Sequence, residues 1–214
     1  TQWIRSMLPR TFRLREPINY EPESKDSVTA LAQNAQRDPI DFTLELLLEK
    51  NGKAMLMNTY ENYFDGNLDI VGTLLADPGT ICGIADAGAH VGFICDAGSA
   101  TSMLTHWSRD RKRGHSLQLK CLVKKQTLDT ARTYGLNDRG VIAPGYRADF
   151  NLIDFDALRV TSPELIYDLP AGGRRMVQRA EGYRHTFVAG TEVMANGEVT
   201  GALPGRLIRG EQSI

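Results

Sequence analysis

The amino-acid sequence predicts an α/β fold that changes to a β-rich region near residue 140, and two kinds of pattern lead to this prediction. In the first 139 residues, segments with apolar residues at helical spacing alternate with short apolar runs that fit buried parallel strands. Such alternation is typical of α/β units, in which each helix crosses over to the next strand. From Gly140 onward, apolar residues instead alternate with polar ones between turn signals, as in half-buried strands.

Five segments have apolar residues at the spacing of one helix face. The first starts at Ser27 and stops before Asp38, which can cap a second helix that has Pro39 in its first turn. The last is closed by Gly135, a residue type that commonly follows a helix end. The predicted helices cover residues 27–35, 39–50, 67–76, 100–109 and 117–134.

Two short apolar runs between these helices, residues 53–58 and 81–85, are predicted to be buried parallel strands. Strand patterns then recur at residues 150–154, 185–189 and 192–195. The last of these is followed by Asn196-Gly197, which is a strong signal for a hairpin turn.

The remaining long segments lack a sustained period. Residues 1–23 contain three prolines and are predicted to be a loop with one short strand, and residues 170–182 are predicted to be a long loop. From the change of pattern we predict two domains, residues 1–139 and residues 140–214.

The composition describes an ordinary soluble globular protein, with 42% hydrophobic and 24% charged residues and a net charge of -1. This charge gives no electrostatic reason to expect a nucleic-acid partner, and the one basic stretch, residues 109–113, is predicted to be a solvated helix end. No apolar run approaches the roughly 18 residues that a membrane span needs. Three scattered cysteines favour a reducing cytoplasm. Because the chain does not begin with Met, we expect a fragment or a processed product.

Residues 84–92, with the sequence IADAGAHVG, carry the clearest sign of chemistry. Asp86 directly follows the predicted strand, so its carboxylate is expected at the carboxyl end of a parallel sheet, where α/β proteins build their sites. Small residues around it, Gly88 among them, leave room for a ligand or a metal to approach the backbone. The local pattern leaves open the alternative that Asp86 only caps a helix or forms a turn.

The histidines and cysteines carry weaker signals. His90 can be a proton shuttle, a ligand or a substrate donor, and a hydrogen-bonded structural role is equally compatible with its loop. The patterns around His106, His115 and His185 favour structural or surface roles. Cys82 and Cys95 flank the Asp86 segment without a His-Asn pattern that would activate them, so we expect small buried hydrophobic side chains.

Several motifs in a fixed order resemble the N-acyl-D-amino-acid deacylases of the amidohydrolase superfamily. The resemblance begins with DAGAHV from Asp86, ICD from Ile94 and LTHWSR from Leu104, and it continues with RGVIAPGYRAD from Arg139 and NGEVTG from Asn196. The similarity covers most of residues 20–210, and the order of the motifs makes it far more specific than any one of them.

This resemblance implies a (β/α)8 TIM barrel that holds one or two metal ions, with a small β-sandwich made from both chain ends. Residues 1–139 would be the last strands and helices of that barrel, and residues 140–214 would be part of the sandwich. Asp86 would contact the metal and its bound water, take a proton from that water and pass a proton to the leaving amine. Zinc, or another divalent metal, would make that water reactive.

The resemblance also directs attention to the substrate. His90 and Gly88 are candidate substrate-binding residues, and Arg109 is a distant candidate for the substrate carboxylate, because no arginine directly follows Asp86. No two of the four histidines stand two residues apart, so the His-x-His pair of the family has no counterpart. We therefore expect most metal ligands to come from outside this chain, and the chain alone to be inactive and free of stoichiometric zinc.

Three hypotheses about function remain at this point. The first is the distal part of a metal-dependent amide hydrolase that deacylates small N-acyl-D-amino acids. The second is another amidohydrolase, dihydroorotase-like or a related C–N hydrolase, since the superfamily shares this aspartate chemistry. The third is a non-catalytic remnant that binds a partner, as a homo-oligomer or with a complementary N-terminal chain, because a piece of a barrel exposes strand edges and apolar faces.

Overall fold

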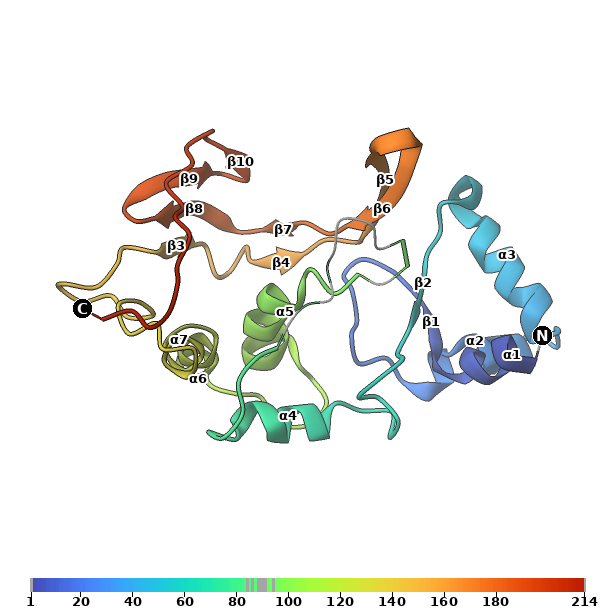
Figure 1. The fold of residues 1–214 in the computed structure, drawn as a ribbon. Helices are drawn as coiled ribbons and strands as arrows, with labels where there is room; N and C mark the ends of the chain where they lie inside the picture. Colours follow the sequence, from blue (N-terminus) through green and yellow to red (C-terminus); the bar gives the residue numbers. More distant parts are fainter. Residues whose placement is uncertain (1, 84, 86, 88–91, 94, 214) are drawn as a thin grey trace. The chain divides into compact units, whose positions relative to one another are not determined.

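The protein is described by a computed structural model that covers residues 2–83, 85, 87, 92–93 and 95–213 (Figure 1). The chain divides into two compact units, Thr1–Thr73 and Leu74–Ile214. The division falls inside helix α4 (Asp69–Ala76). None of the helices in the described ranges is both long and apolar enough to cross a lipid bilayer.

The first unit joins short helices and a two-stranded sheet around a small core. The prediction that Asp38 caps the second helix is confirmed, because its carboxylate accepts hydrogen bonds from the amides of Ile40 and Asp41. Leu8, Val28 and Leu46 form the buried core. The elements are α1 (Gln2–Met7), β1 (Thr11–Arg13), α2 (Val28–Asn34), α3 (Pro39–Gly52) and β2 (Leu56–Asn58).

Two predictions for the first unit need correction. The strand predicted at residues 53–58 is present as β2, but it pairs antiparallel with β1, with Phe12 opposite Met57. The predicted parallel pairing is therefore wrong, because a short apolar run reports burial and carries no information about the direction of its partner. The short strand predicted within residues 1–23 is confirmed as β1, whereas α1 was missed, since its large apolar residues Trp3 and Ile4 are exposed and form no inward stripe.

The predicted helices of the second unit are confirmed, and two of them contain a π-helical turn. Helix α5 (Ser99–Thr105) continues as the turn His106–Asp110. Helix α6 (Leu119–Lys124) passes through the turn Lys125–Asp129 into α7 (Thr130–Thr133). Gly135 follows with a φ of 70°, the left-handed conformation expected after a helix end.

The β-rich part of the second unit contains one four-stranded antiparallel sheet and two hairpin-like pairs. The large sheet has the order β10-β9-β8-β3, and the pairs are β4-β7 and β5-β6. Asn196 and Gly197 both have positive φ, which confirms the predicted hairpin turn between β9 and β10. The strands are β3 (Phe150–Ile153), β4 (Arg159–Val160), β5 (Glu164–Leu169), β6 (Gly173–Val177), β7 (Ala180–Glu181), β8 (Tyr183–Val188), β9 (Thr191–Ala195) and β10 (Glu198–Val199).

The prediction of a long loop at residues 170–182 is wrong, because this range contains β6 and β7. Both strands are joined to their partners by ion pairs across the ladder, Arg175 to Asp168 at 2.7 Å and Arg159 to Glu181 at 2.7 Å. Cross-strand charge pairs stabilise a ladder without the apolar alternation on which the prediction relied.

The strand predicted at residues 81–85 is not formed at the described residues 81–83 and 85, which have no regular secondary structure. Every strand pair in the described ranges is antiparallel, so the parallel crossover units are not seen there. A strand forms only where a neighbour takes up its backbone hydrogen bonds, and the sequence of one segment does not show whether that neighbour is present. The barrel and the sandwich remain predictions, as does the domain boundary between residues 139 and 140.

Gly182 lies with a φ of 97° against the backbone of Leu158, where an added Cβ atom would be 2.6 Å from the Leu158 Cα atom. We predict that Gly182→Ala lowers the free energy of unfolding by more than the roughly 1–2 kcal/mol that left-handed φ alone costs a non-glycine residue. Gly197→Ala is the matched control, because Gly197 also has positive φ but meets no described atom within 4 Å. Chemical denaturation measures both losses, and equal values would contradict the close approach.

Candidate functional site

The predicted site residues Asp86, Gly88 and His90 lie outside the described residues, so their roles stay predictions. The described residues before and after them show how the ends of the segment at residues 81–97 are held in the second unit. At each end the backbone is hydrogen-bonded to a polar side chain that is distant in the sequence: Lys125 donates at the upstream end, and Gln178 accepts at the downstream end.

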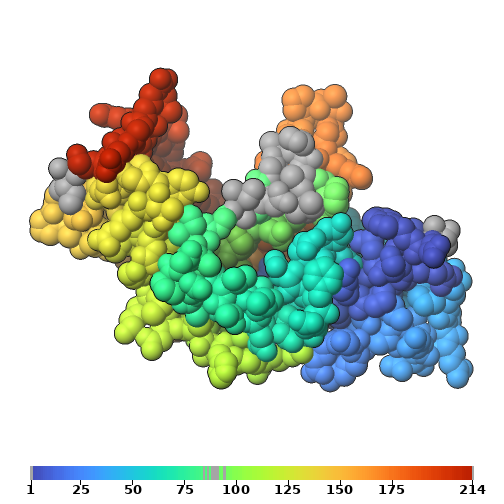
Figure 2. All heavy atoms as spheres, turned by 60° about the horizontal axis from the view of Figure 1, so that its bottom comes forward, coloured from blue at the N-terminus to red at the C-terminus, as the bar shows by residue number. Residues whose placement is uncertain are grey.

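The upstream anchor consists of Lys125 with Asp77 and Thr80. The Lys125 side chain is buried, and its Nζ atom donates to the carbonyl oxygens of Asp77 at 2.7 Å and Thr80 at 2.6 Å, and to Thr80 Oγ1 at 2.9 Å. These oxygens lie just beyond the carboxyl end of α4, where a positive charge is favourable. In Figure 2 the teal-to-green segment around residues 74–83 lies against the yellow-green helical region that carries Lys125.

The downstream anchor consists of Gly98 with Gln178 and Val160. The Gln178 amide oxygen accepts a hydrogen bond from the Gly98 amide at 2.9 Å, and its nitrogen donates to the carbonyl of Thr161 at 3.0 Å. A Cβ atom at Gly98 would lie 2.5 Å from Val160 Cγ1, so only glycine fits this contact with β4. The downstream end of the segment is therefore held against the β-rich part of the same unit.

Helix α5 continues from the downstream anchor and packs on the same framework. Thr101 is buried, and its hydroxyl lies 2.8 Å from the Tyr183 hydroxyl on β8. The Cys82 sulfur lies 3.4 Å from the Met103 sulfur. Burial raises the pKa of the Cys82 thiol, although the nearby Lys125 acts in the opposite direction, and burial also raises the pKa of the Cys95 thiol. Both thiols are half-buried and not fully buried as predicted, and a raised pKa lowers the fraction of reactive thiolate.

Arg109, the predicted contact for a substrate carboxylate, is engaged within the protein. Its guanidinium donates to the carbonyl oxygens of Phe155 and Leu158, the latter at 2.8 Å, and to the Asp110 carboxylate at 2.7 and 2.9 Å. These bonds join the end of the α5 region to the turn before β4, which is a structural function. Binding of a substrate carboxylate by Arg109 stays a prediction.

The basic stretch at residues 109–113 is not a solvated helix end throughout, so that prediction is wrong for Arg111. Arg111 is only 9% exposed, and its guanidinium lies 4.6 Å from the centroid of the Trp107 ring. Its Nη1 atom donates to the carbonyl of His115 at 2.8 Å. A planar guanidinium stacks on an aromatic ring readily, which the sequence pattern of charges does not reveal.

The motif at residues 139–149 also has a structural function. Arg139 donates to both oxygens of Asp138 at 2.7 and 2.9 Å, and this hydrogen bonding holds the pKa of the Asp138 carboxyl below its usual range. Arg147 donates to Asp149 at 2.8 and 2.9 Å, and Asp149 accepts from the Ala189 amide at 2.7 Å. The motif thus joins the segment after α7 to the turn between β8 and β9.

The resemblance implies zinc, which requires several ligand side chains to lie close together. Within the described ranges, no three His, Cys, Asp or Glu side chains come together as metal ligands. His106 packs edge-on against Trp107, and His185 Nδ1 lies 2.5 Å from a carboxylate oxygen of Glu192. The described part of the chain therefore does not fit a metal centre by itself.

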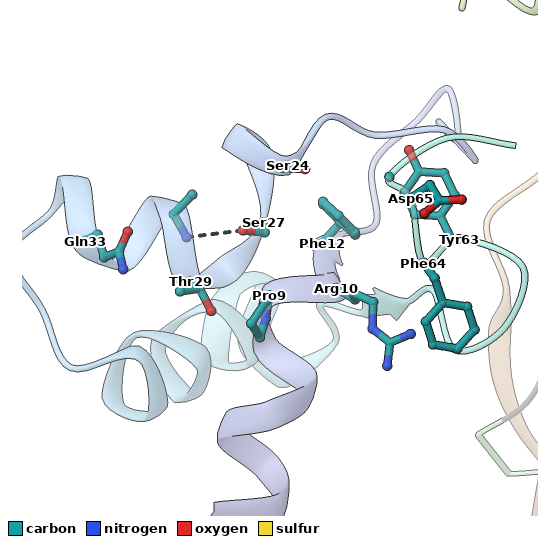
Figure 3. Close-up of a pocket in the computed structure, with 12 residues that line it drawn as sticks. Pro9, Arg10, Phe12, Ser24, Ser27, Thr29, Gln33, Tyr63, Phe64 and Asp65 are labelled. Atoms are coloured by element: carbon teal, nitrogen blue, oxygen red, sulfur yellow. Dashed lines mark hydrogen bonds between the residues drawn. The ribbon is translucent and has the colours of Figure 1, made fainter. Parts of the chain in front are cut away.

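A surface hollow of about 470 Å³ lies in the first unit (Figure 3). Phe12 and Tyr63 contribute apolar surface, and the Arg10 guanidinium lies 4.6 Å from the centroid of the Phe64 ring. None of the predicted site residues lines it. The hollow therefore gives no support to the site predicted around Asp86.

Lys125 and Gln178 were not among the residues predicted from the sequence to serve the site. Lys125 had a usable signal, because it follows the buried Leu122 by one helical turn and so falls on the inward stripe of its helix. Gln178 had none, since its partners are backbone groups of Gly98 and Thr161 that no sequence pattern marks.

Comparison with known proteins gives a matching family, two relatives of similar sequence and several similar solved structures. The family model described as "Amidohydrolase family" matches residues 26–194. An adenine deaminase of Sinorhizobium fredii is 38% identical over 55 residues, and one of Desulfitobacterium hafniense is 45% identical over 51 residues. These matches cover 26% and 23% of this chain and 9% of each relative.

Solved structures of D-aminoacylase are also similar. A crystal structure of D-aminoacylase has a TM-score of 0.48 and 21% sequence identity, and a D-aminoacylase mutant in complex with CuCl2 has a TM-score of 0.46 and 22% identity. Both comparisons cover 92% of this chain and 37% of the solved chain. The chain thus spans well under half the length of each of these relatives.

Replacing Arg109 by Met separates its structural role from a role in substrate binding. We predict that Arg109→Met lowers the free energy of unfolding by roughly 2 kcal/mol, because hydrogen bonds from a charged group are lost and two carbonyls lose their donor. Lys112→Met, at an exposed position of the same stretch, is the control and should leave stability unchanged. Chemical denaturation checks this, and wild-type stability in Arg109→Met would contradict the structural role of Arg109.

Proposed function

We propose that this chain, which belongs to the amidohydrolase family, forms the distal part of a metal-dependent hydrolase that deacylates N-acyl-D-amino acids. The family match carries this proposal, because it runs from residue 26 to residue 194 and includes the Asp86 segment together with both of its anchors. The ordered motifs that resemble the deacylases support the narrower assignment of substrate. Because the chain spans a minor share of its relatives, the activity is proposed for the complete protein.

Asp86 is the proposed catalytic residue. Its carboxylate takes a proton from the water that attacks the amide carbonyl carbon, and it returns a proton to the nitrogen as the C–N bond breaks. The products are a carboxylic acid and a free D-amino acid. Gly88 and His90 are the proposed substrate contacts, since they follow Asp86 in a loop of small residues.

Zinc or another divalent metal is the proposed cofactor, with Asp86 among its contacts. The described residues contain no cluster that fits a metal, so we propose that the other ligands come from a region of the protein outside this chain. On this proposal the chain alone neither holds stoichiometric zinc nor turns over substrate.

A second enzymatic candidate is favoured by the local identity to adenine deaminases. These relatives are named for a different C–N hydrolysis, the removal of an amino group from a purine base. A dihydroorotase-like activity is a third form of the same chemistry. The three differ in substrate, so a panel of substrates separates them.

Replacing Asp86 in the complete protein tests the proposed role. Asp86→Asn removes the proton acceptor while keeping the size of the side chain, so we predict that kcat for an N-acetyl-D-amino acid falls by about 10²–10⁴-fold with little change in KM. Asp156→Asn, an exposed carboxylate in the β-rich part, is the control and should retain full activity. The measurement is steady-state kinetics on N-acyl-D-amino acids, their L-isomers, adenine and dihydroorotate.

Two results of this experiment would count against the proposal. Wild-type kcat in Asp86→Asn would remove the chemical basis of the site. Activity of the wild-type protein on adenine or dihydroorotate, without activity on N-acyl-D-amino acids, would replace the deacylase proposal with the corresponding alternative.

A non-catalytic, partner-binding role for the isolated chain is favoured by one feature of the first unit. Three leucines on α3 are exposed together: Leu44 is 57%, Leu47 is 40% and Leu48 is 62% exposed. Neighbouring exposed leucines of this kind mark surfaces that bind another chain. We propose that these leucines bind a complementary N-terminal chain or, in its absence, a second copy of this chain.

The isolated chain is therefore predicted to self-associate. The double variant Leu44→Glu/Leu48→Glu should shift it toward monomer at micromolar concentration, because charged side chains would have to be desolvated in the interface. Lys53→Glu, which makes the same change in net charge next to the helix, is the control and should remain associated. Size-exclusion chromatography with light scattering measures the mass, and a monomeric wild-type chain would contradict the prediction.

A further inference from the structure

We propose that Lys125 is a positioning residue for the Asp86 carboxylate, because its buried ammonium group fixes the turn from which the Asp86 segment begins. The inference rests on the proposed function of Asp86. Lys125 has no part in the reaction proposed above.

Lys125 carries a charged group that is buried in the second unit. Lys125 is only 6% exposed, and lysine is seldom buried to this extent unless its charge is satisfied. All three donors of an ammonium group are accounted for here, by the carbonyls of Asp77 and Thr80 and by the Thr80 hydroxyl. These acceptors are neutral oxygens, so the bonds fix a backbone turn and do not neutralise a carboxylate.

The turn held by Lys125 lies shortly before Asp86 in the sequence. Its oxygens belong to residues 77–80, and Asp86 follows Thr80 by six residues. The same turn is closed internally, because Asp77 Oδ1 accepts from the Gly79 amide at 2.7 Å. A turn that is held both internally and by Lys125 gives the segment a defined starting point.

Gln126, the neighbour of Lys125, is bonded close to the other end of the segment. Gln126 donates from its side-chain nitrogen to the carbonyl of Ala100 at 2.8 Å, just after the downstream anchor at Gly98. Lys125 and Gln126 thus connect one π-helical turn to both ends of the segment that contains Asp86. Single π-helical turns inside helices occur frequently at functional sites, where they redirect side chains.

The consequence is a link between Lys125 and the rate of the chemical step. A general base works only within hydrogen-bond reach of its proton, and a displacement of about 1 Å can reduce the rate about 10²-fold. Loss of the upstream anchor would release the start of the segment without removing any group that contacts substrate. The effect should therefore appear in kcat and leave KM nearly unchanged.

The test uses the complete protein with Lys125→Gln and, as matched control, Lys124→Gln. Lys124 is adjacent and exposed, and it pairs with Asp129. For Lys125→Gln we expect faster amide hydrogen exchange confined to residues 77–83, with kcat on an N-acetyl-D-amino acid reduced about 10–100-fold and KM unchanged. Lys124→Gln should match the wild-type protein in both measurements.

A milder pair of variants covers the case in which Lys125→Gln does not fold. Thr80→Val removes the hydroxyl that accepts from Lys125 and that also donates to the carbonyls of Leu74 and Asp77, whereas Thr80→Ser keeps this hydroxyl, so exchange and kcat should change in the first and stay normal in the second. Two results with an active wild-type protein would overturn this inference alone. In the first, the variants keep normal kcat. In the second, amide exchange in the variants rises evenly over the whole second unit. A wild-type protein inactive on every substrate of the panel would overturn the proposed function and this inference together.

Discussion

The Lys125 ammonium group fixes the turn at residues 77–80 through bonds to two carbonyl oxygens and one hydroxyl, and the segment of the proposed site begins from this turn. It converts a turn after α4 into a fixed point for the segment that follows. Gln178 has the matching role at Gly98, where the β-rich part leaves no room for a side chain. Both fixed points are held by side chains that are distant in the sequence, so on our proposal the position of Asp86 depends on Lys125 and Gln178.

Arginine side chains have a related structural function elsewhere in this unit. Arg109 joins the end of the α5 region to the turn before β4, and Arg139 with Asp138 joins the segment after α7 to the four-stranded sheet. A guanidinium offers five donors in one plane, so a single side chain can satisfy several backbone carbonyls or both oxygens of a carboxylate. Polar contacts therefore join the helical and the β-rich regions of this unit.

The sequence predicted the helices well because their signals are local: Asp38 caps α3, Gly135 follows α7, and apolar residues recur at helical spacing. It failed for β6 and β7, whose ladders are stabilised by Arg175–Asp168 and Arg159–Glu181 pairs, and for the direction in which β2 pairs. At the candidate site, the small residues around Asp86 singled out the segment in the sequence. Its anchors, Lys125 and Gln178, were not predicted. Their acceptors are backbone oxygens and amides, which every residue has and no residue type marks.

The most direct measurement of the central claim is a crystal structure of the complete protein bound to a phosphinate analogue of an N-acyl-D-amino acid, which resembles the tetrahedral transition state of amide hydrolysis. The account predicts an Asp86 carboxylate oxygen about 2.6–3.2 Å from a phosphinate oxygen of the analogue. It also predicts that Lys125 remains bonded to the turn at residues 77–80 in that complex. An Asp86 side chain that points away from the bound analogue and bonds only to its own loop would contradict the account.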